Sequence, residues 1–308
     1  MSDQRANYRT LDADIRRILR VLSVVCEPIS QTSLKLILDQ LGWRGGDGAP
    51  LSQSLGKLLR ERLIDKGLVQ QARNLLVCHP DLLEPLTRET VADGSFAAIV
   101  AAAEQVVPTH MRNSWDRPSD ERRFRLLRNA IYSGHEDKAL EMMSSAATGK
   151  PWQVRYREVE PLVRICTRSA DPAWLETLSP RLRILCIAPM LREASLELLA
   201  SPASYQLMER LLSPLAETHP DAAQALAEQR LLHARLDQVP ALLAGRDDPD
   251  TLMLAGWLAF MQGDYPGALE RFEASLQATR KLTRKRNVYI PGVPGALHLL
   301  ALLHRGER

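Results

Sequence analysis

The sequence has few cysteines, few aromatic residues and no long apolar run. No stretch approaches the roughly 18 apolar residues of a membrane span, and the polar first ten residues lack the apolar core of a secretory signal. Aromatic residues make up only 5%, so a core has to be built mainly from Leu and Ala. The lack of a long apolar run predicts that the chain has no membrane partner. No CxxC pair occurs, and the widely spaced cysteines are typical of reduced thiols, which predicts a cytoplasmic protein. They are Cys26, Cys78, Cys166 and Cys186.

An excess of one charge and the common catalytic motifs are absent as well. The chain has 40 Lys+Arg against 37 Asp+Glu, and the resulting charge of +3 is too small for a histone-like partner of nucleic acid. The patterns GxxxxGK[ST], GxGxxG, GxSxG and HExxH do not occur. His79 follows Cys78, but no second ligand pair lies at metal-binding spacing. We therefore expect no enzyme activity, catalytic residue, cofactor or metal in this chain.

Residues 1–90 contain three short segments with apolar residues at helical spacing, followed by two strand candidates. We expect helices over 11–25, from Ser30 (with Ser30 or Thr32 as its N-cap) and after Pro50, then strands over 68–71 and 74–78 around a turn at Ala72-Arg73. Over residues 11–80 this order resembles the winged helix-turn-helix superfamily. The string LSQSLGKLLRERLIDKGLV is the most specific part of the resemblance.

The resemblance implies that the third helix enters the major groove of DNA. Nucleic-acid contact would then come from Gln53, Lys57 and Arg60. The alternative is a solvated helix face in a module used for packing or for protein contact. Residues 1–90 hold thirteen Lys and Arg against eleven Asp and Glu, a weaker basic footprint than DNA-binding domains usually have, so we expect weak contact at most. By helical register the outward residues are Ser52, Gln53, Gly56, Lys57, Arg60 and Glu61.

From Ser95 onward, helical patterns follow one another without a clear strand signal. The segment TLMLAGWLAFMQGDYPGALERFEASLQ resembles a tetratricopeptide repeat, and two weaker copies have turns at Gly134 and at residues 236–238. We expect residues 91–308 to form an α-solenoid with a groove for a protein or peptide, unless the array is only a spacer. In the best copy Gly256 is the small position of the first helix, residues 263–265 are the turn, and the small–large–small positions of the second helix are Ala268, Phe272 and Ser275.

Two features lie near the C-terminal end. The segment ATRKLTRKRNVYIPG carries cations that could contact phosphate or an acidic partner, or could be the solvated end of a helix whose dipole favours them. The segment PGVPGALHLLALLHRGER then begins an apolar helix, whereas a solenoid normally ends with a polar face. We expect this helix to be covered by a continuing chain or by self-association. The cations, included among the candidate nucleic-acid contacts, are Arg280, Lys281, Arg284, Lys285 and Arg286.

This end of the chain and the order of its modules resemble the accessory region upstream of the motor in some large bacterial Snf2-type helicases. The resemblance implies a noncatalytic interaction or regulatory scaffold, the N-terminal region of a DNA-remodelling ATPase. No Walker A lysine or DExH box is present, so ATP hydrolysis would lie outside this chain. The alternative is a transcription regulator with a DNA-binding winged helix and a helical repeat domain that senses a ligand or peptide. The predicted organisation is thus mainly α, with a winged helix over 1–90 and tetratricopeptide-like repeats over 91–308.

Overall fold

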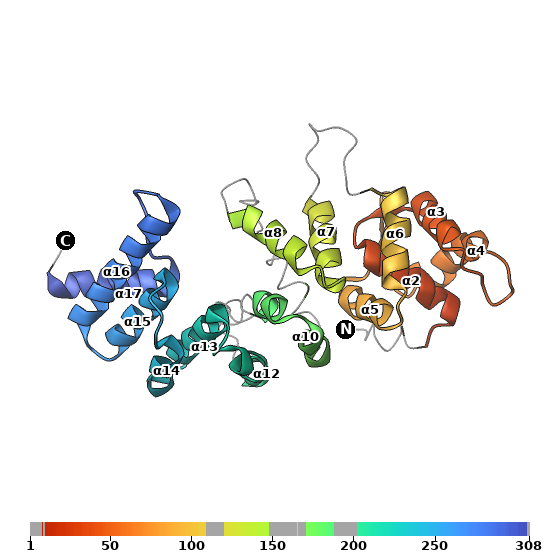
Figure 1. The fold of residues 1–308 in the computed structure, drawn as a ribbon. Helices are drawn as coiled ribbons and strands as arrows, with labels where there is room; N and C mark the ends of the chain where they lie inside the picture. The colour runs from red at the N-terminus through yellow and green to blue at the C-terminus, as the bar shows by residue number, and fades with distance from the viewer. Residues whose placement is uncertain are drawn as a thin grey trace. The chain divides into compact units, whose positions relative to one another are not determined.

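The structure is a computed structural model that describes residue 8 and residues 10–108, 120–147, 165, 171–187 and 202–306 (Figure 1). The prediction of a mainly helical chain is confirmed. Close packing divides the chain into two compact units, Met1–Leu182 and Arg183–Arg308. The division into a domain over 1–90 and a domain over 91–308 stays a prediction. No helix in the described part is long and apolar enough to cross a membrane.

The first unit begins with short helices and a small antiparallel sheet of strand order β1-β3-β2. Strand β3 lies in the middle, where Leu76 pairs with Ile29 on one side and with Gln71 on the other. The last turns of the third helix are π-helical, which the sequence pattern did not indicate. In chain order the elements are α2 (Ala13–Val25), β1 (Ile29–Ser30), α3 (Gln31–Leu41), α4 (Leu51–Leu58), η1 (Leu59–Ile64), β2 (Val69–Ala72) and β3 (Leu75–Cys78).

Local side-chain chemistry explains where these elements start and turn. Asp12 caps α2 by accepting a hydrogen bond from the Ile15 amide at 2.9 Å, and Ser30 caps α3 by accepting one from the Ser33 amide at 3.0 Å. In the hairpin, Arg73 and Asn74 have φ of +50° and +64°, the left-handed conformation that a two-residue turn requires. The turn therefore lies one residue later than predicted, because Ala72 is still paired with Leu75 in the sheet.

The later elements that the structure describes in the first unit are helices, and three of them pack against α2. Its core is formed by the apolar faces of α2 and α3 together with strand β3, and Ile18, Leu34 and Leu76 are at most 2% exposed. Helices α5, α6 and α7 all contact α2. Gly134, predicted as a turn, joins α7 to α8 with φ of +68°. These helices are α5 (Pro80–Ala92), α6 (Phe96–Val106), α7 (Asp120–Tyr132), α8 (Glu136–Ala147) and α10 (Pro172–Thr177).

All the regular elements that the structure describes in the second unit are helices. Helices α15 and α16 form the most extensively packed pair among them. A Cβ atom on Gly256 would lie only 2.7 Å from Cδ1 of Phe272, so the glycine allows the two helices to approach. Ala268 and Phe272 are fully buried, and the Ser275 hydroxyl donates a hydrogen bond to the Pro249 carbonyl at 2.7 Å. The elements are α12 (Pro202–Leu212), η2 (Ser213–Leu215), α13 (Pro220–Leu232), η3 (Leu236–Gln238), α14 (Val239–Leu243), α15 (Pro249–Met261), α16 (Tyr265–Thr283) and α17 (Gly292–Arg305).

Candidate functional site

The predicted nucleic-acid contacts of the first unit lie on α4 and its π-helical continuation. Gln53 and Lys57 are both exposed and one turn apart, while the side chain of Arg60 lies outside the described residues. Ser52 was predicted to point outward, but it is only 5% exposed and its hydroxyl donates a hydrogen bond to the Asp39 carboxylate of α3. That part of the prediction is wrong, because Asp39 provides an acceptor that holds Ser52 in the contact between α3 and α4.

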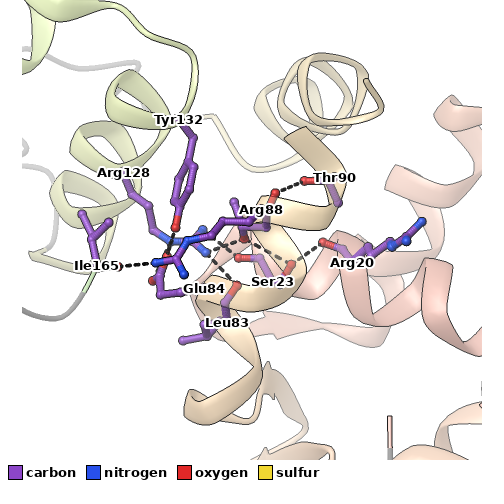
Figure 2. Close-up of polar contacts among 10 residues, drawn as sticks. Arg20, Ser23, Leu83, Glu84, Arg88, Thr90, Arg128, Tyr132 and Ile165 are labelled. Carbon is purple, nitrogen blue, oxygen red and sulfur yellow. Dashed lines mark hydrogen bonds and ion pairs between the residues drawn. The ribbon is translucent and has the colours of Figure 1, made fainter. Parts of the chain in front are cut away.

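A polar cluster that the sequence analysis missed is buried between α2, α5 and α7. Arg128 of α7 is fully buried, and its Nε atom donates to both carboxylate oxygens of Glu84 at 3.0 and 3.1 Å. Its Nη1 atom donates to the Ser23 carbonyl at 2.8 Å, and Nη2 donates to the Leu83 carbonyl at 3.0 Å and to the Thr87 hydroxyl. Figure 2 shows Arg128 reaching from α7 to Glu84 of α5, with Ser23 of α2 beside them.

Tyr132 completes this cluster one turn after Arg128. Its hydroxyl donates a hydrogen bond to Oε2 of Glu84 at 2.6 Å. Burial raises the pKa of Tyr132 well above its usual value, and the negative charge of Glu84 raises it further. Burial by itself lowers the pKa of Arg128, but the adjacent Glu84 carboxylate outweighs this effect and raises it, so the guanidinium stays charged. Both groups therefore keep their protons near neutral pH, and the hydrogen bonds of Arg128 and Tyr132 hold α7 against α2 and α5.

Two further arginines extend the buried polar contacts. Arg125, one turn before Arg128, is 1% exposed and forms an ion pair with Glu27. Burial raises the pKa of Glu27, and the Arg125 guanidinium partly offsets this rise. The Cζ atom of Arg88 of α5 lies 4.5 Å from the centroid of the Trp174 ring. Arg88 also donates a hydrogen bond to the Ile165 carbonyl at 3.1 Å (Figure 2). The first unit therefore continues well past residue 90 as one connected core.

The register of α7 in the sequence carries a signal for this cluster. Arg128 is four residues after Phe124 and three before Ile131, so it falls on the apolar face of α7. Phe124 and Ile131 are both buried, at 4% and 0% exposed. An arginine in such a register is buried only if a carboxylate opposes it, because an unpaired buried charge is very costly.

The predicted cations of the second unit occupy the last turn of α16 and the loop that follows it. All five are exposed, and no carboxylate among the described residues forms an ion pair with them. Helix α16 ends where Arg284 adopts a left-handed φ of +55°. Between residues 274 and 306 the chain has six Lys and Arg and no Asp or Glu. We call Arg280, Lys281, Arg284, Lys285 and Arg286 the basic segment.

An exposed apolar face lies on α17, which begins after the short loop 287–291 that follows the basic segment. Val293 is 48% exposed, Leu300 is 52% exposed, and Leu299 and Leu303 are each 63% exposed. At about 100° per residue these side chains and the exposed Ala296 fall within an arc of roughly 120°. We call Val293, Ala296, Leu299, Leu300 and Leu303 the α17 stripe.

The opposite face of α17 packs on the rest of the second unit. Pro294 and Ala301 are buried, and Leu297 packs against the apolar clusters that contain Trp257 and Phe272. A Cβ atom on Gly295 would overlap the Ile290 carbonyl oxygen, so the loop folds closely over the first turn of α17. The helix is therefore fixed by one face, and the stripe is the face that remains open.

The residues singled out as unlikely ligands have structural roles where they are described. His79 accepts a hydrogen bond at Nδ1 from the Asp81 amide at 3.2 Å and caps α5. Asp248 caps α15 by accepting hydrogen bonds from the amides of Asp250 and Thr251. Cys166 lies outside the described residues. Within the described part, no group of three or more His, Cys, Asp or Glu side chains could hold a metal ion.

Searches with protein-family models, among curated proteins and among solved structures each find no match for this chain.

Proposed function

We propose that this chain is a noncatalytic scaffold that binds another protein through its second unit. The α17 stripe is the observation that carries this proposal. Leaving a Leu side chain exposed forgoes about 1.5–3 kcal/mol relative to burying it. Three leucines and a valine are left open side by side in the stripe, and contiguous apolar patches of this kind mark interaction surfaces.

The arrangement of α15, α16 and α17 supports a tetratricopeptide-like array as the scaffold. In such arrays each helix pair packs on the next pair, so an apolar helix face that no neighbouring helix covers is a place where a further helix can pack. Gly256 is the eighth residue of α15 and faces Phe272 of α16, whereas Leu299 is the eighth residue of α17 and faces solvent. The stripe therefore stands where another helix would pack.

For the first unit we propose a winged helix-turn-helix module. The order α2-β1-α3-α4-β2-β3, the sheet order β1-β3-β2 and the tight turn at Arg73-Asn74 support this assignment. The exposed Gln53 and Lys57 favour a transcription regulator as the second candidate function, with α4 at DNA. The resemblance to the Snf2-type accessory region makes a DNA-remodelling ATPase the kind of protein that we propose this scaffold serves.

The scaffold proposal is tested by comparing the effect of Leu→Lys substitutions at surface positions with their effect at core positions. Leu299→Lys/Leu303→Lys changes two exposed side chains four residues apart, and Leu254→Lys/Leu258→Lys makes the same change at two side chains of α15 that are 3% and 9% exposed. Thermal unfolding of the full chain should show a nearly unchanged midpoint for the first pair and loss of the folded second unit for the second pair. Equal destabilisation by both pairs would mean that the stripe belongs to the core, and the proposal would fail.

A further inference from the structure

We infer that the partner of the α17 stripe is an amphipathic helix that carries Asp and Glu beside its apolar face. This inference rests on the proposed function and names the chemistry of the partner. Its two supports are the spacing of the stripe and the charge beside it.

The spacing of the stripe fits a helix. Val293, Ala296, Leu300 and Leu303 follow one another at intervals of three, four and three residues, the pattern by which one helix packs along another. From Val293 to Leu303 the stripe extends about 15 Å at roughly 1.5 Å per residue, which is nearly three helical turns. A partner helix of three to four turns therefore covers the whole stripe.

The charge beside the stripe selects an acidic partner. The basic segment is separated from α17 by the five residues 287–291, and the described carboxylates leave it unpaired. The first turn of α17 adds positive potential, since its N-cap residue, Pro291, makes no side-chain capping bond. Arg305 at the other end of α17 pairs with Glu273 at 3.6 Å, so the unbalanced positive charge gathers at the N-terminal end.

The same charge argues against the other occupants. A second copy of the chain would bring another basic segment to a surface that has no Asp or Glu between residues 274 and 306. Nucleic acid would pair with the cations but leave the leucines of the stripe uncovered. A helix that lies on an anionic membrane carries Lys and Arg along its polar face, whereas Arg305 is the only Lys or Arg among residues 292–306 of the sequence.

The test uses the full chain and a fluorescently labelled synthetic helix of about four turns. This peptide has Leu at the a and d positions and Glu at the flanking positions, and its counterpart has Lys in place of each Glu. Sedimentation of the chain alone is measured first. We expect a monomer that binds the Glu peptide, and binding of the Lys peptide that is weaker by roughly tenfold or more at low salt.

Three variants locate the binding. Leu300→Lys/Leu303→Lys should abolish binding of the Glu peptide, and the milder Leu303→Ser should weaken it if the double change disturbs the helical circular-dichroism signal. Lys281→Glu/Lys285→Glu should remove the preference for the Glu peptide. The matched control, Lys35→Glu/Lys66→Glu, makes the same charge change at two exposed positions of the first unit and should leave the preference intact.

The outcomes separate this inference from the function on which it rests. Equal binding of both peptides through the stripe would overturn the acidic partner and leave the scaffold proposal standing. Self-association that Leu300→Lys/Leu303→Lys removes would identify a second copy as the occupant. Tighter binding to phosphatidylserine vesicles than to the Glu peptide, lost in Lys281→Glu/Lys285→Glu, would identify a membrane surface. No peptide binding, together with destabilisation by the stripe variants, would overturn both proposals.

Discussion

Replacing Glu84 with Gln is expected to be among the most destabilising single changes in the first unit. Glu84 and Arg128 have side chains that are 4% and 0% exposed, and the change leaves the guanidinium buried without its counter-charge. Removing one partner of such a buried pair typically costs about 3–5 kcal/mol. Since the free energy of unfolding of a domain is only about 5–15 kcal/mol, this loss is a large fraction of the total.

Glu89→Gln is the matched control, because it makes the same chemical change on the same helix. Glu89 also pairs with an arginine, at 3.1 Å from Arg20, but its side chain is 41% exposed. Exposed pairs contribute about 0–1 kcal/mol, so the control should unfold at nearly the same urea concentration as the unmodified chain. Urea unfolding followed by far-ultraviolet circular dichroism measures both variants.

A double variant distinguishes a lost counter-charge from a general disturbance of packing. Glu84→Leu/Arg128→Met removes both charges and leaves no unpaired ion, so it should be more stable than Glu84→Gln alone. Two results would contradict this explanation. The first is an equal loss of unfolding free energy in Glu84→Gln and Glu89→Gln. The second is a double variant whose unfolding free energy is lower than that of Glu84→Gln by as much as an independent second mutation would remove.

Three further predictions follow from other contacts. Gly256→Ala should lower the stability of the second unit by roughly 1–3 kcal/mol in a thermal melt, because the new Cβ atom overlaps the buried Phe272 ring; an unchanged midpoint would contradict the close approach. Burial, aided by Glu89, raises the pKa of Tyr8 from 10.0 to about 12. The stability that depends on the neutral phenol is therefore present below pH 10 and lost as the pH rises toward 12. An absorbance titration compared with Tyr8→Phe checks this value, and ionisation near pH 10 would disprove it. Binding of the chain to duplex DNA should be weak and fall steeply with salt, and Lys57→Glu should reduce it more than Lys35→Glu does; tight binding at physiological salt that Lys57→Glu leaves intact would exclude α4 as the contact.

The features that were predictable from the sequence depend on local chemistry. Ser30 was one of two candidates for the cap of α3, and the close approach at Gly256 follows from the small residue that a tight helix pair needs. The open leucines of α17 were also foreseeable, because leucines at positions 297, 299, 300, 302 and 303 cannot all face one neighbour. Each of these inferences needs only the spacing of residues along the chain.

The features that were missed depend on partners that are distant in the sequence. Strand β1 has two residues and exists because Ile29 and Ser30 pair with β3, which is more than forty residues away. Ser52 is buried because Asp39 of another helix accepts its hydrogen bond. The burial of Arg128 likewise depends on Glu84, and the sequence around either residue does not identify the other as its partner. Periodicity predicts an element and its face, but not which distant group satisfies a buried polar atom.

Hydrogen–deuterium exchange of the full chain with the Glu peptide tests the central claim most directly. If the α17 stripe binds an acidic helix, adding the peptide should slow exchange in residues 292–305 and leave α4 of the first unit unchanged. The Lys peptide at the same concentration should produce much less protection. Protection that appears elsewhere and spares α17, or no protection at saturating peptide, would contradict the account.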